Sequence, residues 1–166
     1  MINRRILLAS AAGLTGFAAL KTLRTSPAVA REKFEVEKTE AEWRAQLTPA
    51  QYRILREEGT EPPGSSPLLK EHRKGTFACA GCDLPLYSSE TKFDSGTGWP
   101  SFWKPLDNAV GERVDRTLGM TRTEIHCRRC GGHLGHVFDD GPKPTGLRYC
   151  MDGLALVFHP AAPSAT

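Results

Sequence analysis

Five cysteines and a pair of histidines are the residues of this 166-residue chain whose types and spacing could do chemistry. Four of the cysteines form two pairs, and the fifth, Cys150, stands alone in the segment RYCMDG. A lone thiol can be a small buried hydrophobic residue, or a nucleophile when its neighbours stabilise the thiolate. The role of Cys150 therefore depends on the residues that the fold brings beside it.

The two pairs, Cys79-x-x-Cys82 and Cys127-x-x-Cys130, are separated by 44 residues. Four thiolates from two such pairs are the tetrahedral ligand set of a structural Zn²⁺. Over this separation the metal would join two distant β-turns, and its binding free energy would contribute to folding. The alternative is disulfide bonds, which an exported protein can form, although a bridge within a CxxC pair is usually a redox device.

Three features favour a chemical role for Cys150. Arg148 lies two residues earlier, a spacing that in a strand places both side chains on one face. The segment itself is polar, and the segment GGHLGHVFDD before it carries His133 and His136. A free thiol is only a few per cent thiolate at neutral pH, so a nucleophile needs cationic or hydrogen-bonding neighbours of this kind. The two histidines could bind a metal or simply be packed, and their spacing does not decide between these.

The elements that must position these residues are short. We expect two helices between about residues 40 and 58, each begun by a capping box and the second ended by Gly59. The proline-rich stretch 60–67 must be a loop. Beyond residue 76, short runs alternate with glycine and proline clusters, which is typical of a small, mainly β, antiparallel domain. The expected strands are 76–79, 122–127, 136–138, 147–150 and 154–158.

Residues 1–30 have the features of an export signal. Arg4 and Arg5 precede an uncharged stretch of 15 residues, and Ala-Val-Ala at 28–30 provides a cleavage site. The arginine pair resembles a twin-arginine signal, which predicts a periplasmic or otherwise exported protein. An ordinary secretory signal and an uncleaved signal that anchors the chain are the alternatives. The apolar stretch is shorter than the ~20 residues that span a bilayer, which disfavours a permanent anchor. No stable membrane span is expected once the signal has been cleaved.

The remaining residues, 31–166, carry 18 basic and 19 acidic side chains. This balance gives no indication of a nucleic-acid-binding surface. We expect a flexible linker over 31–38, a single domain over 39–160 and a disordered tail over 161–166.

Four long stretches stand in order between about Trp43 and Phe158: LTPAQYRILREEGTEPP, GTFACAGCDLPLYSSETKFDSGTGWPSFW, RTEIHCRRCGGHLGHVFDDGP and PTGLRYC. Together they resemble the methionine sulfoxide reductase B family. The resemblance implies two small antiparallel β-sheets tied by one structural zinc at the four paired cysteines. It also implies the reduction of methionine-R-sulfoxide, free or in oxidised proteins, to methionine.

The resemblance also implies roles for individual residues. Cys150 would be the nucleophile, and His136 would position or protonate the substrate oxygen with His133 beside it. Trp99 would hold the substrate's methyl group, and Arg148 is a second residue expected at the substrate. These roles suit a sulfoxide, whose polar S–O bond and apolar methyl group need a soft nucleophile, a proton donor and an aromatic wall.

The chain departs from the family pattern at two positions. Asp152 stands where Asn is usual, and an ionised carboxylate there would disfavour the Cys150 thiolate, whereas a protonated one could donate a proton to the leaving oxygen. Thr97 stands where many members have a cysteine that resolves the oxidised nucleophile. The sulfenic acid would then be reduced by an external thiol or a thioredoxin-like protein.

Two other functions fit parts of the sequence. One is a non-catalytic, zinc-ribbon-like module that binds a peptide or another protein. The other is an exported protein in which the CxxC pairs are oxidised to disulfides. The first needs no nucleophile, and the second needs no metal.

Overall fold

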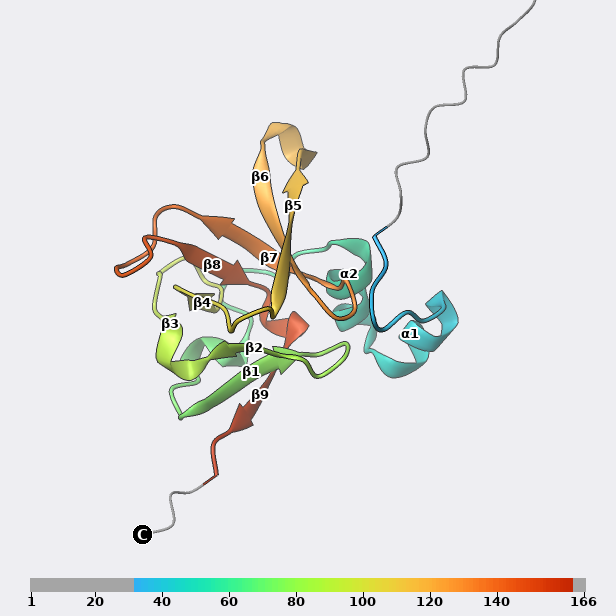
Figure 1. Cartoon of the computed structure of the whole chain (residues 1–166), viewed down its shortest axis with the longest axis horizontal. Helices are drawn as coiled ribbons and strands as arrows, with labels where there is room; N and C mark the ends of the chain where they lie inside the picture. Colours follow the sequence, from blue (N-terminus) through green and yellow to red (C-terminus); the bar gives the residue numbers. More distant parts are fainter. Residues whose placement is uncertain (1–31, 163–166) are drawn as a thin grey trace, which may run out of the picture. The chain divides into compact units, whose positions relative to one another are not determined.

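The computed structural model describes residues 32–162, so the predicted signal lies outside the described residues. The described residues fold into one compact unit that is mainly β, with two antiparallel sheets and two short helices near its N-terminal end (Figure 1). The predicted fold class is confirmed. None of the helices in residues 32–162 combines the length and the apolar character that crossing a membrane requires.

The helices α1 (Glu40–Gln46) and α2 (Pro49–Glu57) begin as the sequence predicts. Thr39 and Thr48 cap them, and both capping boxes are complete. The predicted end of α2 is wrong by one residue, because Glu58 takes the left-handed conformation at φ 53°. Gly59 follows and approaches the backbone of Arg53 closely, since an added Cβ would lie 2.9 Å from the Arg53 carbonyl oxygen.

The strands form a three-stranded and a six-stranded sheet, and all the recorded pairings are antiparallel. The first sheet has the order β2-β1-β9, with β1 Gly75–Cys79, β2 Pro85–Ser88 and β9 Leu156–Pro160. The second has the order β3-β4-β8-β7-β6-β5, with β3 Lys92–Phe93, β4 Ser101–Phe102, β5 Val110–Asp115, β6 Arg122–Cys127, β7 His133–Phe138 and β8 Arg148–Met151.

Each of the five predicted strands overlaps an observed one, and β6 has the predicted bounds. The sequence missed β2, β3, β4 and β5; two of these have only two residues, which is too short for a periodic pattern. β9 begins two residues late because a 3₁₀ helix precedes it. The described 3₁₀ helices are η1 Pro67–Lys70, η2 Ser89–Thr91, η3 Thr117–Gly119 and η4 Gly153–Ala155.

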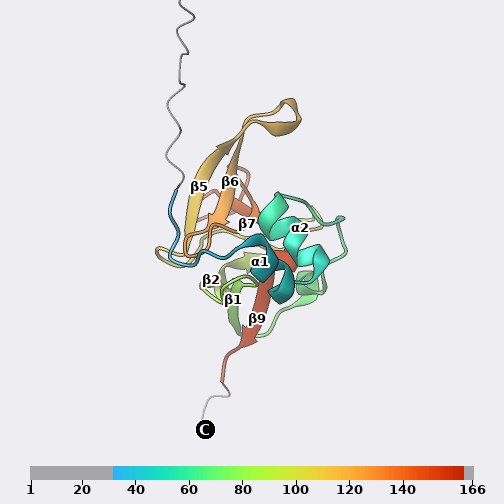
Figure 2. The ribbon, with the colours of Figure 1, turned by 90° about the vertical axis from the view of Figure 1, so that its right-hand side faces the viewer.

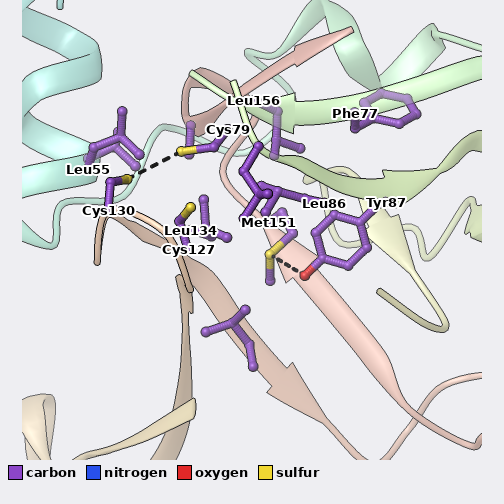
Figure 3. Packing of buried hydrophobic residues seen from close by; sticks show 14 of the residues in the cluster. Leu55, Phe77, Cys79, Leu86, Tyr87, Cys127, Cys130, Leu134, Met151 and Leu156 are labelled. Carbon is purple, nitrogen blue, oxygen red and sulfur yellow. Dashed lines mark hydrogen bonds between the residues drawn. The ribbon is translucent and has the colours of Figure 1, made fainter. Parts of the chain in front are cut away.

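The core lies between the two sheets, as Figure 3 shows. The ring of Tyr87 from one sheet stacks on that of Phe102 from the other at 4.3 Å, and its hydroxyl donates to the sulfur of Met151 at 3.1 Å. Met151 is fully buried. Because side chains alternate along a strand, burial of Met151 in this core turns the preceding residue, Cys150, to the opposite face of β8.

Both ends of the described chain contact the domain. The N–H of Val36 donates to the carbonyl of Arg129 at 2.9 Å, and the Phe34 ring lies edge-on to His126. At the other end, the N–H of Ala161 donates to the carbonyl of Lys74. Figure 2 shows the β5–β6 hairpin extending beyond the rest of the fold. The linker and tail bounds stay predictions.

Candidate active site and metal centre

The four paired cysteines meet at one point between the sheets. Their sulfur atoms all lie within 4.8 Å of one another, with Cys79 to Cys130 at 3.7 Å and Cys82 to Cys127 at 3.5 Å. The Cys79–Cys130 contact is drawn in Figure 3. Zn–S bonds of about 2.3 Å place tetrahedral sulfur ligands about 3.8 Å apart, which matches this spacing. All five cysteines are free, in contrast to the disulfide alternative.

The turns of the two pairs arrange these sulfur atoms. Cys79 ends β1 and Cys127 ends β6, and after each a tight turn brings the second cysteine back. The turns are closed by hydrogen bonds from Asp83 to the Cys79 carbonyl and from Gly131 to the Cys127 carbonyl. A cation bound here would link the two sheets, because one pair comes from each.

Cys150 lies in β8 between two strands. Its Cα is paired with that of Ser101 on β4 and with that of His136 on β7. The side chain is partly exposed, and its sulfur lies 3.8 Å from the hydroxyl of Thr97. The thiol is therefore reachable from solvent and directly opposite an imidazole-bearing residue.

The pKa of Cys150 is raised, in contrast to the expectation that its cationic neighbours favour the thiolate. Burial raises the pKa of Cys150, and this outweighs the hydrogen bond with Thr97 and the charge of Arg148, which lower it. The charge of Asp152 raises it further, as the sequence suggested. The resting thiol is therefore less ionised at neutral pH than a free cysteine.

A β-bulge decides how the two histidines face. The pairing shifts between Ile125 and His126, so that Leu134 on β7 is an extra residue without a partner. Residues three apart in a regular strand point to opposite faces, but one extra residue brings them to the same face. The rings of His133 and His136 accordingly lie 5.4 Å apart, edge to face.

Each of these histidines is held by a carboxylate. His133 donates from Nδ1 to Glu124 at 2.9 Å, and His136 donates from Nε2 to Asp115 at 2.8 Å. Burial lowers the pKa of His136, and the hydrogen bond that His136 donates to Asp115 opposes this by raising it. Among the described residues, no cluster of three or more metal-ligating side chains includes either histidine. The packed alternative, with a carboxylate partner for each ring, describes them better than a metal pair does.

Asp152 follows β8 and is 4% exposed. Its Oδ1 accepts from the N–H of Glu61 at 2.8 Å, and its Oδ2 lies 4.0 Å from Nε2 of His133, an atom without a hydrogen-bond partner. Burial raises the pKa of Asp152 to about 6. Both of the protonation states considered from the sequence are therefore accessible close to neutral pH.

Trp99 and Arg148 are the two residues that the sequence places at the substrate. Trp99 is partly buried in the loop before β4, and its Nε1 donates to the carbonyl of Glu61 at 3.0 Å. Arg148 donates twice to Asp140 at 2.8 Å and stacks over Phe138. Its guanidinium is thus committed to a carboxylate, and its contact with substrate stays a prediction.

Sequence reasoning missed the carboxylates that position these residues. Glu124 could have been found from the sequence, because it lies within a predicted strand, and a charged residue on the buried face of a strand needs a buried partner. Glu61 lay inside a stretch that matches the family. Asp115 had no signal, because its contact with His136 depends on the path of the β5–β6 hairpin.

A partly exposed cysteine paired in the sheet with a histidine-bearing position has the residues of a cysteine-nucleophile site, and the four clustered cysteines form a separate set of metal ligands.

Comparison with known proteins defines the family. Residues 47–160 match the SelR domain family. The chain is 58% identical over 127 residues to "Peptide methionine sulfoxide reductase MsrB" of Agrobacterium fabrum, which covers 76% of this chain and 94% of that protein. It is 59% identical over 124 residues to the protein of the same name from Thiobacillus denitrificans, covering 74% and 94% respectively. The chain belongs to the methionine sulfoxide reductase B family.

Proposed function

We propose that this protein reduces methionine-R-sulfoxide, free or in oxidised proteins, to methionine. The observation that carries the proposal is the position of Cys150, a partly exposed thiol directly opposite His136 in the sheet. The relatives named as methionine sulfoxide reductases support the same activity.

In the proposed reaction, the methyl group of the substrate packs against Trp99 and the Cys150 thiolate attacks the sulfoxide sulfur. His136 or Asp152 supplies a proton to the oxygen, with His133 beside them. The attack joins the two sulfur atoms, and the S–O bond of the substrate breaks as its oxygen takes the proton. Return of this oxygen, as hydroxide or water, to the Cys150 sulfur then breaks the S–S bond, so that methionine leaves and a sulfenic acid remains on Cys150. The enzyme sulfur is oxidised by two electrons and the substrate sulfur is reduced by two.

The reductant of the sulfenic acid is proposed to come from outside the chain. The position near the nucleophile where many members have a cysteine holds Thr97, 3.8 Å from the Cys150 sulfur. The other four cysteines are gathered in the cluster. A small thiol or a thioredoxin-like protein would therefore return Cys150 to its reduced state.

The cysteine cluster is proposed to hold one structural Zn²⁺, with Cys79, Cys82, Cys127 and Cys130 as its ligands. Bound zinc supplies folding free energy to such a site and no reactive position, because all four ligands come from the protein. The chain's own contribution is the pair of turns that aim one cysteine pair from each sheet at the same point.

We also propose that residues 1–30 direct the protein out of the cytoplasm by the twin-arginine route and are then removed. The repaired proteins would be those of the periplasm. N-terminal sequencing of protein recovered from that compartment tests this, and a first residue before Arg31 would contradict cleavage at the proposed site.

The proposed activity is tested by a single turnover without reductant. One mole of methionine per mole of protein is expected from the R epimer, because only one thiol is available to accept oxygen. No methionine is expected from the S epimer, because the proposed substrate is methionine-R-sulfoxide. Dimedone should then label Cys150 as a sulfenic acid. A non-catalytic binding module would release no methionine and would leave the thiol unlabelled.

Replacing Asp115 with asparagine is expected to lower turnover about tenfold and to move its alkaline limit to lower pH. The hydrogen bond that His136 donates to the Asp115 carboxylate raises the pKa of His136. Its weakening lowers that pKa, so the proton donor is lost sooner as the pH rises. The rate of methionine formation measured against pH checks this. Asp107→Asn, which changes an exposed aspartate, is the control. An unshifted profile would assign the proton donation elsewhere.

Replacing Asp152 with asparagine is expected to change how stability depends on pH. The folded-state pKa of about 6 lies above the ordinary value of about 3.9, so this carboxyl stabilises the fold fully only below about pH 4. That contribution is lost as the pH rises through 6, by about 3 kcal/mol in total. Urea unfolding of both proteins between pH 4 and 7.5 should show the wild type losing stability relative to the variant. A difference that is independent of pH would contradict the raised pKa.

A further inference from the structure

Glu61 lies in the loop after α2 and is hydrogen-bonded both to Trp99 and to Asp152. Its side chain is 2% exposed. Its backbone carbonyl accepts the hydrogen bond from Nε1 of Trp99, and its N–H donates to Oδ1 of Asp152. One residue from the loop after α2 therefore joins the indole to the segment that follows the nucleophile.

The carboxylate of Glu61 strengthens the second of these connections. Oε1 accepts from the N–H of Gly153 at 2.6 Å, and Oε2 accepts from the N–H of Leu154 at 3.1 Å. Hydrogen bonds to an ionised acceptor are roughly twice as strong as neutral ones. The two oxygens thus bind the backbone immediately beyond Asp152 and fix its distance from Glu61.

The loop of Glu61 also packs directly on the loop that carries Trp99. The N–H of Gly64 donates to the carbonyl of Gly98 at 2.8 Å. A Cβ added to Gly98 would lie 2.8 Å from the Cβ of Pro63, so the two loops meet without room for a further atom. The backbone that carries Trp99 is therefore packed closely against the Glu61 loop.

We propose that Glu61 is a positioning residue that fixes the indole of Trp99 relative to the thiol of Cys150 and thereby sets the selectivity for a methyl sulfoxide. The proposal rests on the proposed function. Rates of reactions between bound groups depend steeply on geometry, and a misplacement of about 1 Å can cost about a hundredfold. A displaced indole would also no longer bound the space for the methyl group, so a larger substituent would be accepted more readily.

The test compares methionine-R-sulfoxide with ethionine-R-sulfoxide, whose substituent is one CH₂ larger. Glu61→Gln keeps the shape but replaces one acceptor oxygen by an NH₂ group, which cannot accept from the backbone N–H it faces. We expect kcat/KM for the methyl substrate to fall about tenfold, and the methyl-to-ethyl ratio of kcat/KM to fall about fivefold. Glu90→Gln, an exposed glutamate in η2, should leave both values unchanged.

A merely structural role for Glu61 would lower activity without changing this ratio. A Glu61→Gln protein that folds, by its far-UV circular dichroism and metal content, and keeps the wild-type ratio therefore overturns the proposal. Wild-type protein inactive on both sulfoxides would instead overturn the proposed function, and this inference with it.

If Glu61→Gln does not fold, the contact can be disturbed from the other loop. Gly98→Ala forces a Cβ against Pro63, whereas Gly96→Ala adds a Cβ with nothing within 4 Å. Both glycines have positive φ, 94° and 69°, so the backbone strain of the two substitutions is similar in kind. The methyl-to-ethyl ratio should fall in Gly98→Ala and not in Gly96→Ala. Equal ratios in the two variants would overturn the proposal.

Discussion

Cys150→Ser is expected to lower the reduction of methionine-R-sulfoxide at least about a thousandfold, as loss of a catalytic nucleophile commonly does. A serine hydroxyl is hardly ionised at neutral pH, and accepting the sulfoxide oxygen would create a weak O–O bond. The replacement is nearly the same size, so the pairing of β8 with Ser101 and His136 should persist. Methionine released in a single turnover is the measurement.

Two properties of the Cys150→Ser protein make this result informative. It should keep the wild type's content of the proposed zinc and its cooperative unfolding, because Cys150 is not part of the cysteine cluster. It should give no dimedone adduct after exposure to the sulfoxide. If the variant still produced methionine at a tenth of the wild-type rate or more, another group would be the nucleophile.

Cys127→Ser is expected to have the opposite pattern, with loss of the fold as its primary effect. Cys127 is fully buried and ends β6, and its sulfur lies 3.5 Å from that of Cys82 across the two pairs. Structural zinc sites contribute about 10–16 kcal/mol, which is as large as the whole stability of a typical domain, about 5–15 kcal/mol. The variant should therefore bind no zinc and show no cooperative thermal transition.

Comparing Cys150→Ser with Cys127→Ser distinguishes the structural role of the cysteine cluster from the catalytic role of the active site. Metal content is measured together with thermal unfolding, and chelation of the wild-type metal should reproduce the Cys127→Ser result. A metal-free Cys127→Ser protein that melted within a few degrees of the wild type would show that packing between the sheets suffices without the metal.

The local parts of the fold were predictable from the sequence because their causes lie within a few residues. Thr39 and Thr48 cap their helices through side chains three positions away, and the run RTEIHC has the pattern of the strand it forms. The shortest strands, β3 and β4, were not predictable, since two residues carry no pattern and these strands exist only by pairing with others.

The sequence also identified the candidates for the chemistry by residue type and spacing: two CxxC pairs, a fifth cysteine and the GGHLGH segment. The tertiary structure alone decided how these residues are held. The bulge at Leu134 turns both histidines to one face, and Glu61 reaches Asp152 across 91 positions of the chain. Such contacts exist only after the sheets have closed on each other, and the same closure buries Cys150 enough to raise its pKa above that of an exposed thiol.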